Sequence, residues 1–115
     1  MDIYDSANDL AEEIRNSGMC REHARLQREV MADETNRSLL KEYKRLQWVL
    51  QMQAVSGGQV STEDSERFSQ LSTLLFMNAD VQVYLLSEIK VQKTLADVIK
   101  LLTDAAGIQM DIPGL

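Results

Sequence analysis

Residues that interrupt helices are rare in this chain and confined to a few places. Its 115 residues include one proline, Pro113, and five glycines. Between these positions the chain is rich in Leu, Glu, Gln, Lys, Arg, Met and Ala, which lose little side-chain freedom in a helix. We therefore predict an all-α fold with few breaks between its helices.

Apolar residues recur at spacings of three and four, which places them on one side of each expected helix. A first helix carries Ile3, Leu10 and Ile14 on one stripe, and "NSG" at 16–18 should close it with Gly18 in the left-handed conformation. We expect a second helix over 19–31, a third from the N-cap Asp33 to about Val55, a fourth after the N-cap Ser61, and a last one over 81–106. Asn78 or Asp80 should cap that last helix, and Gly107 should end it.

The length fits one domain, which we place at residues 1–107, followed by a flexible tail over 108–115. At about 1.5 Å per residue, the third helix would extend roughly 34 Å and the last about 40 Å. A globule of this length has a diameter near ~35 Å. The two long helices therefore predict an elongated bundle of about five helices, and we expect it to form a homodimer.

The last helix carries a broad stripe that we expect to face the core or a dimer partner. Glu88 and Gln92 lie one turn apart within it. A buried carboxylate can act as a general base, but the helix shows no partner for it, so a polar contact that fixes helix register is the preferred interpretation. The stripe comprises Val81, Tyr84, Leu85, Glu88, Gln92, Leu95, Ile99 and Leu102.

Cys20 and His23, in "MCREH", are the only cysteine and histidine of the chain. They supply two ligands, whereas a structural zinc site needs four and a catalytic one at least three. A Cys–His nucleophile would also need a third group to orient the imidazole. His23 lies in line with Met19, Leu26 and Val30, so helix packing is preferred over metal binding or catalysis, and we expect no cofactor.

Charge is distributed unevenly, although the total is -6. Residues 18–55 form the only basic zone, with seven bases and five acids. An acidic total argues against general nucleic-acid binding but leaves room for a local basic face. The acidic start lacks the features of a signal peptide and no apolar run is long enough to span a membrane, so we expect a cytoplasmic protein.

The third helix offers the best candidate for a functional surface. Its expected core stripe is Leu39, Tyr43, Leu46 and Leu50, and Trp48 points to the opposite side. An aromatic anchor among basic groups is typical of a protein-binding hot spot, but it could also stack on RNA bases or be buried by a neighbouring helix. The candidate partner-binding face is Arg37, Lys41, Lys44, Arg45, Trp48 and Met52.

Three segments resemble the YlbF/YmcA family of small helical regulators in Gram-positive bacteria. They are "IYDSANDLAEEIRNS", "REVMADETNRSLLKEYKRLQWVLQMQAVSGGQVSTEDSERFSQL" and "YLLSEIKVQKTLADVIKLL", with "ADE" before the third helix and a Gly-rich break before the fourth. The resemblance implies an all-helical, dimeric cytoplasmic protein without enzymatic activity. Family members are linked to competence, sporulation and biofilm development, and some steer an endoribonuclease in messenger RNA processing.

Some members of that family carry clustered cysteines near the C-terminus that bind an iron–sulfur cluster. The matching region here, "LLTDAAGIQMDIPGL", has none, so the resemblance implies no cluster and places the chain with the cysteine-poor branch. We expect a regulatory adaptor that contacts a paralogue or an RNA-processing enzyme. The alternative is a direct RNA-binding module that uses the basic face of the third helix.

Overall fold

The described part of the chain is all-α, as predicted from its scarcity of helix breakers. The computed structural model describes residues 2–110. These residues form five helices: α1 (Ile3–Arg15), α2 (Gly18–Met31), α3 (Glu34–Val55), α4 (Thr62–Phe76) and α5 (Ala79–Ala106). Of the predicted tail over 108–115, residues 111–115 lie outside the described residues.

Short polar side chains begin the helices where the sequence predicts. The Asp33 carboxylate accepts a hydrogen bond from the Asn36 amide at 2.9 Å, and the Ser61 hydroxyl accepts one from the Asp64 amide at 3.2 Å. The Asn78 side chain accepts from two amides of the first turn of α5. Gly107 ends α5 in the left-handed conformation with a φ of 73°. These local signals therefore set four of the boundaries.

The expected role of Gly18 is wrong. Gly18 does not have a positive φ and is the first residue of α2, not the residue that closes α1. Ser17 is the N-cap of α2, and its Oγ accepts from the Cys20 amide at 3.2 Å. Because Ser17 starts the next helix directly, the chain turns without a left-handed residue at this junction.

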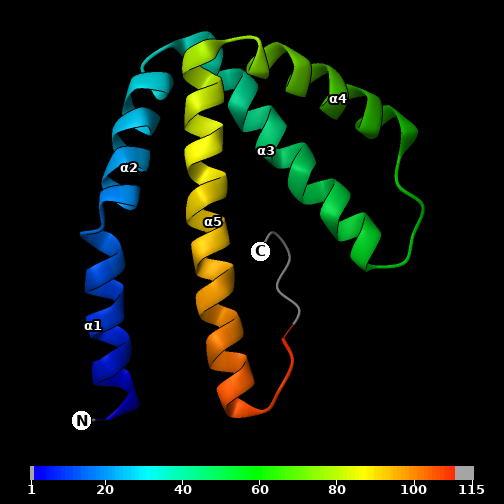
Figure 1. Cartoon of the computed structure of the whole chain (residues 1–115). Coiled ribbons are helices and arrows are strands. Elements are labelled where there is room, and N and C mark those ends of the chain that lie inside the picture. The colour runs from blue at the N-terminus through cyan, green and yellow to red at the C-terminus, as the bar shows by residue number, and fades with distance from the viewer. Residues whose placement is uncertain (1, 111–115) are drawn as a thin grey trace.

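The helices form a flat, splayed arrangement (Figure 1). α1 and α2 follow one another along one side of α5, while α3 and α4 form an antiparallel hairpin that diverges from it. The principal dimensions are 49 × 37 × 16 Å and the radius of gyration is 16.8 Å. A compact globule of this length would have a radius of gyration near ~13 Å, so the predicted elongation is confirmed. Among the described residues, no helix has both the length and the apolar character needed to cross a membrane.

The core lies where α2, α3, α4 and α5 converge. Its buried side chains are Leu26, Val30, Leu40, Leu75, Val81, Tyr84 and Leu85. On α3 the predicted stripe is incomplete. Leu46 is buried and the half-buried Leu39 and Tyr43 pack against the core, but the stripe did not include the fully buried Leu40. α3 has neighbours on two sides: the Tyr43 ring stacks on Phe68 of α4 at 4.8 Å between ring centroids, and Leu40 packs into the core with α2 and α5. A single stripe therefore cannot describe its buried surface.

Candidate partner-binding face and the polar cluster beside it

Trp48 is exposed on α3. Its exposed fraction is 61%, and the side chain of Val55, two turns further along the helix, is also exposed. Arg37, Lys41 and Arg45 are exposed, and Met52 is half-buried. Trp48 is a large aromatic side chain that is exposed to water, on the same side of α3 as three cations. Its exposed apolar area is of the kind that dominates binding in protein interfaces. We define the Trp48 face as Arg37, Lys41, Arg45, Trp48 and Met52.

Lys44 does not share this environment. Its ammonium turns toward α5, where Nζ lies 2.7 and 2.6 Å from the two carboxylate oxygens of Glu88 and donates to the Tyr84 hydroxyl at 3.3 Å. The same nitrogen lies 5.5 Å from the centre of the Tyr84 ring. At ~100° per residue, five of the six sequence-predicted face residues lie along one side of α3, whereas Lys44 joins a separate polar cluster.

Glu88 is the centre of this polar cluster, which joins three helices. Besides Lys44 of α3, it accepts a hydrogen bond from the Tyr84 hydroxyl of α5 at 3.1 Å, and its Oε2 lies 3.3 Å from Nε2 of His23 on α2. The His23 ring stacks on Tyr84 with 5.4 Å between centroids. We call His23, Lys44, Tyr84 and Glu88 the Glu88 cluster.

Charge pairing controls ionisation in the Glu88 cluster. Burial raises the pKa of Glu88, but the hydrogen bonds and positive charge of Lys44, aided by His23 and Tyr84, outweigh it and hold the pKa below its usual value. Burial lowers the pKa of Lys44, and its contacts with Glu88 more than reverse this effect and raise the pKa overall. Burial and the neighbouring Glu88 charge raise the pKa of the Tyr84 phenol. At neutral pH the pair is therefore ionised, which suits a structural contact better than proton transfer.

In the "MCREH" segment, His23 packs against α5 and also makes a polar contact there. His23 is half-buried against Tyr84 and Glu88, and Cys20 is a half-buried free thiol one turn earlier. Within residues 2–110, no group of three His, Cys, Asp or Glu side chains is placed to hold a metal ion. His23 therefore packs against α5, and Cys20 lies one turn before it on α2.

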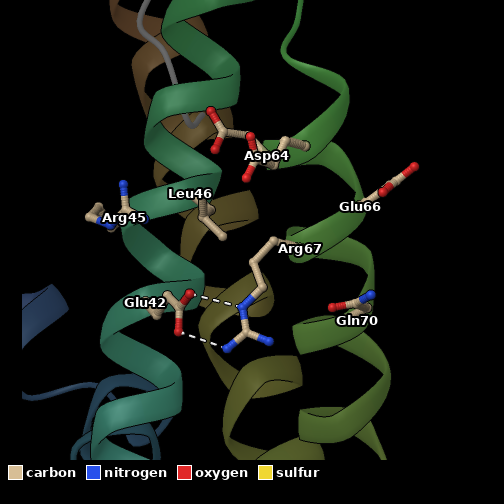
Figure 2. A pocket seen from close by; sticks show the side chains of 8 residues that line it. Glu42, Arg45, Leu46, Asp64, Glu66, Arg67 and Gln70 are labelled. Atoms are coloured by element: carbon tan, nitrogen blue, oxygen red, sulfur yellow. Dashed lines mark hydrogen bonds and ion pairs between the residues drawn. The ribbon is translucent and has the colours of Figure 1, made fainter.

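A second polar contact joins α3 to α4. Arg67 donates from Nε and Nη2 to the two carboxylate oxygens of Glu42, at 2.9 and 3.1 Å. Figure 2 shows Arg67 reaching from α4 toward Glu42, while Arg45, which also lines the surrounding groove, extends from the far side of α3. The surrounding groove has a volume of about 380 Å³ and also includes Leu46, Glu63, Asp64, Glu66 and Gln70. Its carboxylates give the α3–α4 groove an acidic character that contrasts with the Trp48 face.

The predicted stripe of α5 has two different environments. Val81, Tyr84 and Leu85 are buried in the core. Further along the helix, Glu88, Gln92, Leu95 and Ile99 are half-buried, and Leu102 is 59% exposed. The stripe therefore runs from the core toward solvent as α5 extends beyond the helices that cover its start.

Similarity to known proteins identifies the family of this chain. The profile described as "Control of competence regulator ComK, YlbF/YmcA" matches residues 3–105. The chain belongs to the YlbF/YmcA family. This family comprises regulators and proteins of unknown function and is not a known enzyme family. The match confirms the resemblance seen in the three sequence segments.

Relatives and one solved structure share most of the chain. A "UPF0342 protein" of Halothermothrix orenii is 29% identical over 102 residues, which cover 89% of this chain and 86% of the relative. A "UPF0342 protein" of Lactobacillus delbrueckii subsp. bulgaricus is 30% identical over 100 residues, with 87% and 86% covered. A "Protein of Unknown Function (DUF964) from Bacillus stearothermophilus" superposes with a TM-score of 0.76 at 19% identity, over 91% of this chain and 92% of that one. This structure establishes that the fold is shared.

Sequence reasoning missed the Glu42–Arg67 contact and the partners of Glu88. Glu42 and Arg67 are 25 positions apart, and Lys44 and Glu88 are 44 positions apart. One signal was present, since Glu88 lay within an apolar stripe and a buried carboxylate requires a cation. Choosing Lys44 from twelve Lys and Arg residues needs the helix arrangement itself.

Proposed function

We propose that this protein is a non-enzymatic, cytoplasmic regulatory adaptor that binds a protein partner through the Trp48 face. The observation that carries the proposal is the 61% exposed fraction of Trp48 within α3. An exposed tryptophan offers a large apolar area, and the nearby Arg45 can form forked hydrogen bonds to a carboxylate. Membership of a regulator family supports the proposal.

A paralogue or an RNA-processing enzyme is the kind of partner that we propose. The Trp48 face is cationic, so the matching surface on the partner should combine an apolar pocket with carboxylates. We also propose that the protein acts as a single domain over residues 1–107 and as a homodimer. Support for the homodimer comes from the apolar side chains that α1 and the end of α5 leave exposed, including Ile3 and Leu101.

Direct RNA binding has weaker support. Lys44 is neutralised by Glu88, and the α3–α4 groove next to Arg45 contains four carboxylates, from Glu42, Glu63, Asp64 and Glu66. Few cations therefore remain to neutralise phosphates, on which RNA affinity largely depends. We expect the intact protein to show no RNA binding that falls with salt concentration.

The test is a double variant, W48A with R45A, used as bait in extracts of the native cells. Partners of the unchanged protein are identified by mass spectrometry, and their direct affinity is then measured with purified components. We expect the double variant to weaken that affinity at least ~100-fold, because two central anchors are removed. Helicity by circular dichroism should stay unchanged, since both side chains are exposed.

A matched control removes one large apolar and one cationic side chain elsewhere. Leu86 and Lys90 are both exposed on α5, one turn apart. The L86A/K90A variant should keep full affinity for the partner. Equal affinity of the W48A/R45A variant and the unchanged protein would contradict the proposal that the Trp48 face binds the partner. RNA binding by the unchanged protein that weakens with salt and is lost in that variant would favour direct RNA binding.

A further inference from the structure

The first helix is the least covered element of the described chain. None of the residues of α1 is buried, although it is 13 residues long. Isolated helices of this length are marginal in water, because most helix stability in proteins comes from packing one face. α1 nevertheless has a well-defined apolar face. Ile3 and Tyr4 are 83% and 79% exposed on it, next to Ala7, Leu10 and Ala11.

The last turns of α5 continue this apolar surface. A groove of about 320 Å³ lies between α1 and α5 and is lined by Asp2, Ile3, Ser6, Ala7, Leu10 and Leu102. Leu102 and the adjacent Leu101 are 59% and 70% exposed. The charged side chains of this part of α5 pair with one another, Lys93 with Asp97 at 3.2 Å and Lys100 with Asp104 at 2.8 Å.

These charges are confined to one side of the helix. At ~100° per residue, the four positions fall within an arc of roughly 60°, and Leu101 and Leu102 lie outside it. On α1 the same spacing places Asp5, Asp9, Glu12 and Glu13 on the side opposite Ile3, Ala7 and Tyr4. Both helices thus separate an uncharged apolar face from their charges. We define the α1–α5 face as Ile3, Tyr4, Ala7, Leu10, Leu101 and Leu102.

The exposed area of the α1–α5 face is close to what a dimer requires. Aromatic side chains such as Tyr4 bury about 150–250 Å² each, and we take about 180 Å², within the lower part of this range, for Ile and Leu. At the exposed fractions given above, Ile3, Tyr4, Leu101 and Leu102 present roughly 550 Å² per chain. Complete cover of two such faces would bury up to about 1,100 Å² from these four residues, near the lower limit of ~1,200 Å² for a stable interface, and the flanking Ala7 and Leu10 would add to it.

We propose that the α1–α5 face binds the same face of a second copy of this chain, so that α1 and the end of α5 from two copies form a four-helix bundle. A twofold interface joins identical patches and therefore requires a self-complementary surface, which an uncharged apolar face provides. The acidic side of each α1, with Asp5, Asp9, Glu12 and Glu13, points away from this contact, although each chain has a net charge of -6. Asp2, which lines the groove, uses its carboxylate to cap α1. The inference names the surface of the homodimer proposed above and rests on it.

The test places charges on this face without weakening the monomer. Glutamate in place of Ile3 lies in the first turn of α1, where a negative charge favours the helix, and Leu101 is exposed. Sedimentation equilibrium from about 1 to about 100 µM should show the unchanged protein as a dimer. The I3E/L101E substitutions should raise the dissociation constant of the dimer at least ~100-fold. Mixing I3E/L101E with I3K/L101K should restore a dimer that neither forms alone.

Controls and outcomes separate this surface from the homodimer itself. Leu74 and Leu86 are also exposed, at 53% and 52%, and lie outside the α1–α5 face, so L74E/L86E is the control variant and should remain dimeric. A monomeric unchanged protein would overturn both the homodimer and this inference. If I3E/L101E has the same dissociation constant as the unchanged dimer, the homodimer proposal stands and only the assignment of its interface to the α1–α5 face is contradicted. A mixture of the two charged variants that stays monomeric would also contradict that assignment alone.

Discussion

At the scale of single residues, Glu88 connects more of the fold than any sequence pattern indicated. Its carboxylate contacts His23 of α2, Lys44 of α3 and Tyr84 of α5. Its side chain is only 19% exposed, so the charge depends on these partners for the solvation that water would otherwise provide. We interpret Glu88 as the residue that fixes how α3 crosses α5.

The first prediction concerns the loss of that charge. E88Q should lower the free energy of unfolding by about 1–2 kcal/mol, because it leaves the half-buried Lys44 ammonium without its counter-charge. Urea unfolding followed by circular dichroism measures the change. E66Q removes a carboxylate from an exposed position on α4 and should leave the unfolding free energy nearly unchanged. Equal stability of E88Q and the unchanged protein would show that the Glu88 cluster contributes nothing.

The second prediction concerns pH. Because the pKa of Glu88 is lowered below its ordinary 4.5 in the folded protein, its contribution to stability is complete above that value and is lost as pH falls through the folded pKa. The stability difference between the unchanged protein and E88Q should therefore be constant from neutral pH down to mildly acidic pH. It should shrink below pH 4.5. A difference that persists undiminished at the lowest pH would show that it does not arise from the Glu88 charge.

At the scale of the helices, the sequence predicted most boundaries because the signals that set them are local. Asp33, Ser61, Asn78 and Gly107 each act on backbone groups within one turn, so no other helix is needed to interpret them. Gly18 shows where this reasoning fails. A glycine next to a helix end suits either a left-handed cap or the start of the following helix, and the Ser17 hydroxyl decides between them.

The third prediction compares these two glycines. Gly107 has a φ of 73° and open space around it, so G107A should destabilise the protein by about 1 kcal/mol through backbone strain alone. Gly18 has ordinary helical geometry and open space, so G18A should stabilise it by roughly 0.5 kcal/mol by restricting the unfolded chain. Thermal unfolding of both variants measures the two signs, and destabilisation by G18A would contradict the assignment of Gly18 to α2.

At the scale of the whole molecule, elongation could be predicted from helix length, but the splay of the helices could not. Periodicity identifies an apolar face without saying how many neighbours share it, which is why Leu40 was missed on α3. The same limit applies to the candidate site. Trp48 was predicted to lie opposite the core, but whether another helix covers it depends on the tertiary arrangement, in which it is 61% exposed.

The fourth prediction follows from the uneven cover of the helices. In a dilute solution of monomers, the amides of α1 should exchange with solvent quickly, because opening this helix exposes no buried side chain. At concentrations where the α1–α5 face is covered by a second copy, the same amides should exchange at about one tenth of that rate or more slowly still. Amides of α2 near the buried Leu26 and Val30 provide the internal control and should be protected under both conditions. Hydrogen exchange read by mass spectrometry measures both helices in one experiment, and α1 rates that do not depend on concentration would contradict the proposed cover of this helix.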